Sequence, residues 1–244
     1  MNILKEIALL PTHALNGFFD RYTGGKNRPI YFPTKETRPE LLVFEKNFET
    51  VKHEHQNVEK LNAIPAYEDL DKFQYDADEP QTKWKVFVLN MMGEFDEVAE
   101  KLCPEICNMI RQVPDVFQAM FSVLEPGRSI PAHKGPYKGY LRYHIGVKIP
   151  KVNPPKIRIE NTYHTWEEGK GVIFDDSWDH EVINNATEER VVLIVDILRP
   201  LPRTPLAINR FLTYKLIKPL YAKSMMKKNE LFLKKMENKE MIDS

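Results

Sequence analysis

The feature that most constrains the fold is a run of strict alternation between residues 139 and 149. Its apolar side chains stand at every second position: Leu141, Tyr143, Ile145, Val147 and Ile149. Successive side chains of a β-strand point to opposite faces, so the run is predicted to be a strand with one apolar and one polar face. Arg142 and His144 share the polar face. Two explanations stay open: exposure to solvent, or a barrel interior that binds something, because an unpaired buried charge is costly.

Further short strands are expected around this one. The segments with strand-like composition are 84–89, 121–124, 157–160, 163–166, 172–174 and 191–198, with a tight turn at Asn161-Thr162. Closely spaced strands joined by turns favour an antiparallel sandwich or barrel over a parallel sheet. Residues 41–60 and 96–111 carry apolar side chains at helical spacing, and we expect helices there.

The net charge of the chain is zero, from 35 Lys plus Arg and 35 Asp plus Glu among 244 residues. This balance gives no support to nucleic-acid binding, which is typical of chains with a basic excess, so we expect no nucleic-acid partner. The charge is nevertheless uneven along the chain. Residues 201–244 hold ten Lys or Arg and four Asp or Glu, a net charge of +6, which leaves −6 for residues 1–200. We therefore treat residues 201–244 as a basic extension.

The basic extension begins with an amphipathic stretch. Residues 206–221 interleave Leu, Ile, Phe and Tyr side chains with Arg210, Lys215 and Lys218. A helix of this kind can lie in the interface of an anionic membrane, so peripheral membrane contact through residues 206–235 is one prediction. The alternative is a helix that packs back on the barrel and keeps its lysines in solvent.

The targeting features favour the cytoplasm. The sequence has no run of about 18 apolar residues, so no membrane-spanning helix is predicted, and its first residues lack the pattern of a signal peptide. Cys103 and Cys107 have no His or Cys partners nearby, which is typical of a reducing compartment. We expect a cytoplasmic protein, or one that is peripheral on the inner face of the membrane if the extension binds lipid.

Two histidines lie near the ends of predicted strands. His133 precedes the alternating strand, and His180 lies between two apolar strands. Imidazole is a suitable ligand for a divalent transition metal. A surface or core role explains either histidine alone. Together with Arg142 and with Arg190, which begins another strand, they favour a site for a metal and a dicarboxylate.

The region from about residue 104 to residue 200 resembles the aspartyl/asparaginyl β-hydroxylase family. The matching segments are Phe121-Ser122-Val123-Leu124-Glu125-Pro126-Gly127, His133-Lys134-Gly135-Pro136, Leu141-Arg142-Tyr143-His144, Trp166-Glu167-Glu168-Gly169, Phe174-Asp175-Asp176-Ser177, His180-Glu181-Val182 and Arg190. The resemblance implies an α+β fold with a mainly β core, a double-stranded β-helix of the jelly-roll or cupin-like kind. We expect one catalytic oxygenase domain over 1–200, helical over 1–115 with its barrel core at 116–200, followed by the helical extension 201–244.

The resemblance also implies an oxygenase that uses Fe(II), with 2-oxoglutarate and O2 as co-substrates. At the matching positions, it implies that His133 and His180 are the catalytic iron ligands. The residues implied for the 2-oxoglutarate pocket are Ser122, Arg142, His144 and Arg190. A guanidinium fork matches the two oxygens of a carboxylate. Which arginine meets which carboxylate stays open.

Most oxygenases of this kind have a carboxylate ligand two residues after the first histidine. Gly135 stands at that position here, as it does in the family, which implies a site of two histidines with water in the third place. Asp175, Asp176 and Asp179 precede His180 and are alternatives for a third ligand. Aspartate is also typical of turns and of hydrogen bonds that support metal ligands, and we favour this second role.

The substrate is less constrained than the chemistry. Cys103-Pro104 ahead of residues 116–124 and Arg142-Tyr143-His144 look most like the bacterial lipid A acyl-chain hydroxylases of the family. This likeness implies hydroxylation of an unactivated C–H on a lipid acyl chain, in lipid A or a related membrane lipid. One alternative is β-hydroxylation of Asp or Asn side chains in a peptide or protein. Others are a cupin-type dioxygenase with three ligands, His133, His144 and His180, that does not use 2-oxoglutarate, and a binding module without iron chemistry.

Overall fold

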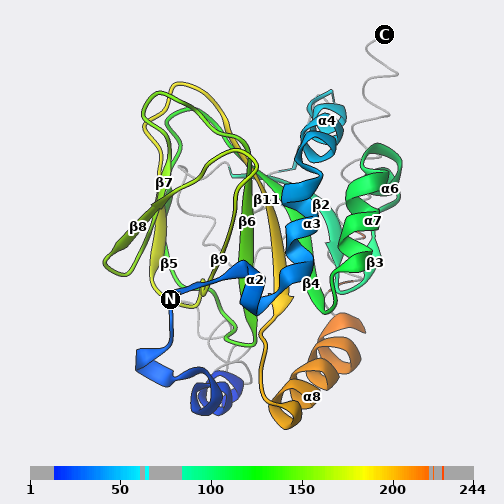
Figure 1. Cartoon of the computed structure of the whole chain (residues 1–244), viewed down its shortest axis with the longest axis vertical. Coiled ribbons are helices and arrows are strands. Elements are labelled where there is room, and N and C mark those ends of the chain that lie inside the picture. The colour runs from blue at the N-terminus through cyan, green and yellow to red at the C-terminus, as the bar shows by residue number, and fades with distance from the viewer. Residues whose placement is uncertain (1–13, 61–63, 66–83, 220–221, 223–226, 228–244) are drawn as a thin grey trace.

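The computed structural model describes residues 14–60, 64–65, 84–219, 222 and 227. In this part of the chain, two antiparallel sheets face each other (Figure 1). The large sheet has the order β1-β9-β6-β11-β4-β2-β3, with strands Tyr31–Phe32, Gly171–Phe174, Tyr140–Lys148, Arg190–Leu198, Val116–Leu124, Lys85–Met91 and Glu94–Phe95. The small sheet has the order β5-β10-β7-β8, with strands Ile130–His133, His180–Ile183, Lys156–Ile159 and Thr162–Thr165.

Helices cover the outer face of the large sheet, opposite the small sheet (Figure 1). They are α3 (Leu42–Lys46), α4 (Phe48–Glu59), α6 (Glu97–Leu102) and α7 (Pro104–Gln112). The short elements η1 (Gly25–Asn27), α2 (Thr34–Thr37) and η2 (Pro39–Leu41) flank β1. A helix over residues 14–23 and α8 (Arg203–Phe211) lie together at one end of the molecule, and α8 continues as the π-helix η3 (Leu212–Ile217).

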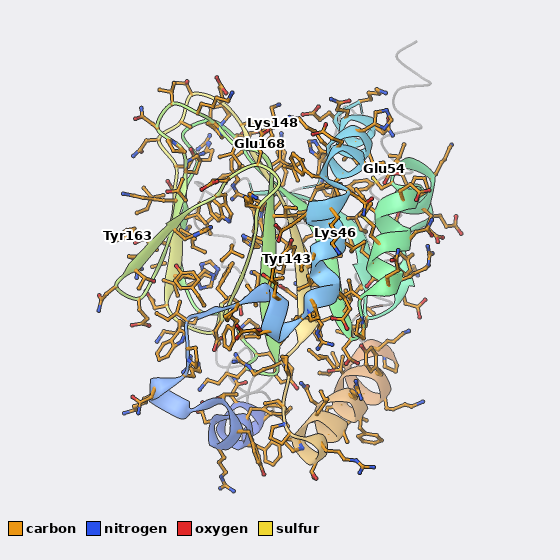
Figure 2. The ribbon with its side chains drawn as sticks, viewed as in Figure 1. Lys46, Glu54, Tyr143, Lys148, Tyr163 and Glu168 are labelled. Carbon is orange, nitrogen blue, oxygen red and sulfur yellow. The ribbon has the colours of Figure 1, made fainter. Side chains whose placement is uncertain are left out.

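Strand β6 has the two faces that its alternation predicts. Tyr143 belongs to the core between the large sheet and the helices, and Figure 2 shows it between β6 and α3. Arg142 and His144 point the other way, into the space between the sheets, where they are only 8% and 5% exposed. Exposure to solvent is therefore the wrong explanation for the polar face, which lines the barrel interior.

Both long helices expected near the N-terminus are interrupted. The stretch 41–60 divides at Asn47 into α3 and α4, and the stretch 96–111 divides at Cys103. Proline disfavours helical geometry in the residue before it, so Pro104 ends α6 and begins α7. Glu54, which reaches from α4 toward α7 in Figure 2, accepts hydrogen bonds from the first backbone N–H groups of α7, those of Glu105 and Ile106, both at 2.9 Å. This buried carboxylate fixes α7 on α4.

The expected class, an α+β chain with a mainly β, cupin-like jelly-roll core and N-terminal helices, is confirmed. Of the expected basic helical extension 201–244, α8 and η3 are helical, and residues 220–221, 223–226 and 228–244 lie outside the described residues. The sheet extends further toward the N-terminus than the predicted core of 116–200, because β1, β2 and β3 join it. Sequence analysis did not predict β5 and β10 as strands, because β5 contains Pro131, which is disfavoured within strands, and β10 begins with two polar residues, His180 and Glu181. These two strands position the histidines.

Candidate active site

The two predicted metal ligands are brought together. His133 ends β5 and His180 begins β10, and they are direct partners across this antiparallel pair. Their ring centroids lie 4.2 Å apart. The Nδ1 atom of His133 lies 2.8 Å from the Pro131 carbonyl, and that of His180 lies 2.9 Å from the Trp178 carbonyl. Because a carbonyl only accepts, each Nδ1 is the protonated nitrogen, and each Nε2 has the lone pair that a metal needs.

The surroundings keep both imidazoles neutral. Burial and, after it, the neighbouring His133 lower the pKa of His180 to about 3. Burial also lowers the pKa of His133 below its ordinary value. Neutral imidazole is the form that binds a metal, so the pair is ready to bind one throughout the neutral range.

Arg190 is a buried cation without an anion. Its side chain lies on the barrel-facing side of β11, and the residue is 1% exposed. Its Nη1 donates to the Ser122 hydroxyl at 3.1 Å, its Nε has no hydrogen-bond partner among the described residues, and no described carboxylate pairs with it. Burial lowers the pKa of Arg190 to about 9. Leaving a buried charge unpaired is costly, so the site is suited to an anionic ligand.

Ser122 has a proton to donate beside this arginine. Its Oγ accepts from Trp84 Nε1 at 2.6 Å as well as from Arg190. A hydroxyl has two lone pairs and one hydrogen, so two accepted bonds leave the hydrogen for another acceptor. Ser122 and Arg190 together therefore offer two donors to one carboxylate.

His144 completes this interior. Its ring stacks on Trp166 at 5.8 Å and meets the edge of Phe174 at 4.9 Å, and neither ring nitrogen has a hydrogen-bond partner among the described residues. Burial, with Arg142 and Arg190 adding to it, holds the pKa of His144 well below its usual value. Trp166 also lies 5.0 Å from the Arg190 guanidinium carbon, so one indole ring borders both residues.

Arg142 lies in the same interior but is already paired. Its Nε and Nη2 donate to the two carboxylate oxygens of Asp196, both at 2.8 Å, and its Nη1 lies 3.2 Å from Asp176 Oδ2. Gln118 donates to the same Asp196 at 2.6 Å. Arg142 and Asp196 are direct partners across β6 and β11. The expected role of Arg142 toward 2-oxoglutarate thus stays a prediction, and Arg190 is the arginine with unused donors.

Asp176 fills the space that Gly135 leaves. A Cβ atom on Gly135 would lie 2.5 Å from Asp176 Oδ1. Asp176 Oδ2 accepts from the Tyr140 hydroxyl at 3.0 Å, whereas Oδ1 has no partner among the described residues. Burial raises the pKa of Asp176 to about 7. In the described part of the chain, no three His, Cys, Asp or Glu side chains gather as a metal site, so the geometry offers the histidine pair with this carboxylate nearby.

The other two aspartates hold the turn before His180. Asp175 pairs with Arg28 at 2.9 Å and with Arg199 at 2.7 Å, and it accepts from the Ser177 backbone N–H at 3.0 Å. The arginines lower the pKa of Asp175 despite its burial. Asp179, on the far side of the turn, pairs with Arg158. Both carboxylates are thus engaged by arginines.

Sequence reasoning missed four residues that shape the site: Arg28, Trp84, Trp166 and Asp196. Asp196 had a signal, because the phase of β11 places it on the same face as Arg190. The other three come from outside the central strands, and only the folded chain brings them to the interior.

The barrel interior thus holds a pair of neutral histidines, which suit a metal ion, and a buried arginine without a described carboxylate, which suits an anion. The sequence profile of the aspartyl/asparaginyl beta-hydroxylase family matches residues 45–200. The chain belongs to this family of hydroxylases.

Several relatives are similar to the chain. The ornithine lipid ester-linked acyl 2-hydroxylase of Rhizobium tropici is 35% identical over 191 residues, which are 78% of this chain and 67% of that protein. The human aspartyl/asparaginyl beta-hydroxylase is 39% identical over 122 residues, 48% of this chain and 16% of that protein. The chain thus spans only a small part of the human enzyme. Among solved structures, the cupin domain of an XRE family transcriptional regulator from Enterobacter cloacae matches 48% of this chain and 98% of its own, with a TM-score of 0.33 and 14% identity.

Proposed function

We propose that the protein is an Fe(II)- and 2-oxoglutarate-dependent dioxygenase that hydroxylates an unactivated C–H of a lipid acyl chain. The single observation that carries the proposal is that one barrel interior holds both a neutral histidine pair and Arg190, a buried cation that no described carboxylate neutralises; between them, His144 is influenced by the charges of both Arg190 and His180. A metal ion would bind to the histidine pair, and a carboxylate of the dicarboxylate would neutralise Arg190.

The residues fit the metal. His133 and His180 would hold Fe(II) through Nε2, and the carbonyls of Pro131 and Trp178 hold the tautomer that this requires. Iron bound there supplies the activation of O2 that attack on an unactivated C–H demands. Asp176 Oδ1, unpartnered among the described residues, is a nearby hydrogen-bond acceptor for water.

The residues also fit 2-oxoglutarate. Arg190 and Ser122 would bind one carboxylate, with the guanidinium supplying charge and the hydroxyl supplying a proton. His144, neutral and without a described partner, has one nitrogen to donate and one to accept. Trp166 and Phe174 line this interior with apolar surface, which excludes water and strengthens each of these hydrogen bonds.

The relatives support a lipid acceptor more than a peptide. The Rhizobium tropici protein, named for its action on ornithine lipid, aligns with 78% of this chain, whereas the human aspartyl/asparaginyl enzyme aligns with 48%. Hydroxylation of Asp or Asn side chains is therefore the second candidate. The three-histidine alternative lacks support, because in the described residues His144 forms no metal-binding group with His133 and His180. We place the activity in the cytoplasm, at the inner face of the membrane.

The test is turnover of 2-oxoglutarate by the full chain with Fe(II), measured as succinate, together with mass spectrometry of each acceptor. The acceptors are ornithine lipid, lipid A and peptides that contain Asp or Asn. We expect an acyl lipid to stimulate succinate formation and to gain one oxygen atom. Stimulation by the peptides alone would favour the second candidate. The His180→Ala variant should be inactive, and an active variant would refute the assigned ligand pair.

A further inference from the structure

Exposed apolar side chains gather on α8 and η3. Six large apolar side chains are strongly exposed in the described part of the chain, and three of them fall within nine residues: Ile208, Phe211 and Leu216, at 37%, 58% and 51% exposure. Spacings of three and eight residues keep these positions on one side of a helix. The outer face, as we call it, consists of these three residues and the exposed Lys215.

The opposite side of α8 is attached to the loop that leads out of the active site. Asn209 is fully buried, its Nδ2 donates to the Gly139 carbonyl at 2.6 Å, and its Oδ1 accepts from the Tyr137 hydroxyl at 2.6 Å. Tyr137 and Gly139 belong to the connection between His133 and Arg142. The outer face is therefore held in a fixed relation to the metal-binding histidines, rather than on an independent arm.

The charges around the outer face favour an anionic partner. Arg210 is neutralised by Asp115 and Lys218 by Glu94, but no described carboxylate pairs with Lys215 or Arg203. Because Lys215 belongs to the outer face, a second copy of the chain seated on this face would bring two such cations together, which like-charge repulsion opposes. Apolar side chains interleaved with unpaired cations are instead suited to the headgroup region of an anionic bilayer.

We infer that the outer face is a docking surface for an anionic lipid bilayer, and that docking presents the end of the barrel next to α8 to the membrane. In the described part of the chain, no helix is long and apolar enough to span a bilayer. A role of docking in catalysis rests on the proposed acyl-lipid function. Binding of the outer face to the bilayer does not rest on it.

The test is flotation of the full chain with vesicles of phosphatidylglycerol and phosphatidylcholine, and separately with phosphatidylcholine alone. The variant Phe211→Asp should lower partitioning onto the anionic vesicles by about tenfold, because a buried Phe contributes on this scale. Tyr163→Asp is the matched control: Tyr163 is 59% exposed on β8, on the side of the molecule away from α8 (Figure 2), and its variant should bind as the parent does. Higher salt should weaken the parent's binding.

Flotation and sedimentation test the docking surface without iron or 2-oxoglutarate. If the parent does not float with anionic vesicles, or if both variants bind equally, the docking surface is refuted. If sedimentation shows that the parent is a dimer and Phe211→Asp a monomer, the outer face is an interface between copies and the inference is overturned. Vesicle binding without succinate formation would refute the proposed function and leave docking intact. Both variants should keep the parent's melting temperature, since the replaced side chains are exposed.

Discussion

The guanidinium carbon of Arg28 lies 3.6 Å above the ring of Trp178, whose carbonyl accepts the hydrogen bond that orients His180. Arg28 also donates to Asp175 at 2.9 Å and to the Ser177 hydroxyl at 3.1 Å. One residue from the N-terminal part of the chain thus contacts three members of the turn before His180, the proposed metal ligand. Cation–π contact and charge-assisted hydrogen bonds together make this a rigid support.

Replacing Arg28 by Met should therefore loosen His180 without removing a ligand. We expect metal affinity to fall by about tenfold, the lower end of what loss of a ligand's supporting contacts costs. Titration with Fe(II) or Co(II) under anaerobic conditions measures it. The control is Arg111→Met, because Arg111 also lies over a ring, that of Phe95 at 4.1 Å, but belongs to α7 on the outer face of the large sheet. Equal affinity of the two variants would contradict the assigned role of Arg28.

Replacing Arg190 by Met should have opposite effects on binding and on stability. The 2-oxoglutarate requirement should rise by about 30-fold or more, because a buried charged partner is lost. The free energy of unfolding of the protein without ligands should not fall, and we expect it to rise, since an unpaired buried cation is removed. Steady-state kinetics and urea unfolding provide the two measurements. A variant that is destabilised with an unchanged 2-oxoglutarate requirement would show that Arg190 is structural.

The Arg142–Asp196 pair should be coupled. Asp196→Leu leaves the buried guanidinium of Arg142 without its bidentate partner, and we expect a loss of about 3 kcal/mol in the free energy of unfolding. The double variant Arg142→Met with Asp196→Leu should lose less free energy of unfolding than the sum of the two single variants. Removing both members of the pair leaves neither of them as an unpaired charge. A double-mutant cycle by urea denaturation measures the coupling. Additive losses would mean that the pair contributes no coupling.

His55 should make stability depend on pH away from the active site. Its ring is buried against Phe121, with centroids 4.8 Å apart, and burial lowers its pKa to about 4. Between this value and the ordinary 6.5, the unfolded chain binds the proton and the folded chain does not, so stability falls as the pH falls through this range. Relative to His55→Leu, the parent should lose about 2 kcal/mol between pH 7 and pH 5. If the free energy of unfolding changes by the same amount in parent and variant between the two pH values, this prediction is contradicted.

The sequence allowed the faces of the central strands to be predicted, but not the partners across them. Alternation in β6 placed Arg142 and His144 together, because period-two patterning follows directly from strand geometry. That Arg142 faces Asp196 depends on the register between β6 and β11, which pairing over long sequence separation determines. Strands β5 and β10 escaped prediction because β5 contains a proline and β10 begins with two polar residues. The histidines could still be assigned through the family resemblance. Trp166 stood in a segment that matches the family but had no role assigned, and Arg28 had no local signal.

The collision between a Cβ at position 135 and the Asp176 carboxylate has an evolutionary consequence. A side chain at position 135 would need the space that the Asp176 carboxylate occupies, so a carboxylate ligand there requires Asp176 to shift or to be replaced. Substitutions at 135 and 176 are therefore expected to be epistatic, with a side chain at 135 tolerated better when residue 176 is smaller. The proposed two-histidine centre would in this sense be preserved by a neighbouring carboxylate that packs against Gly135.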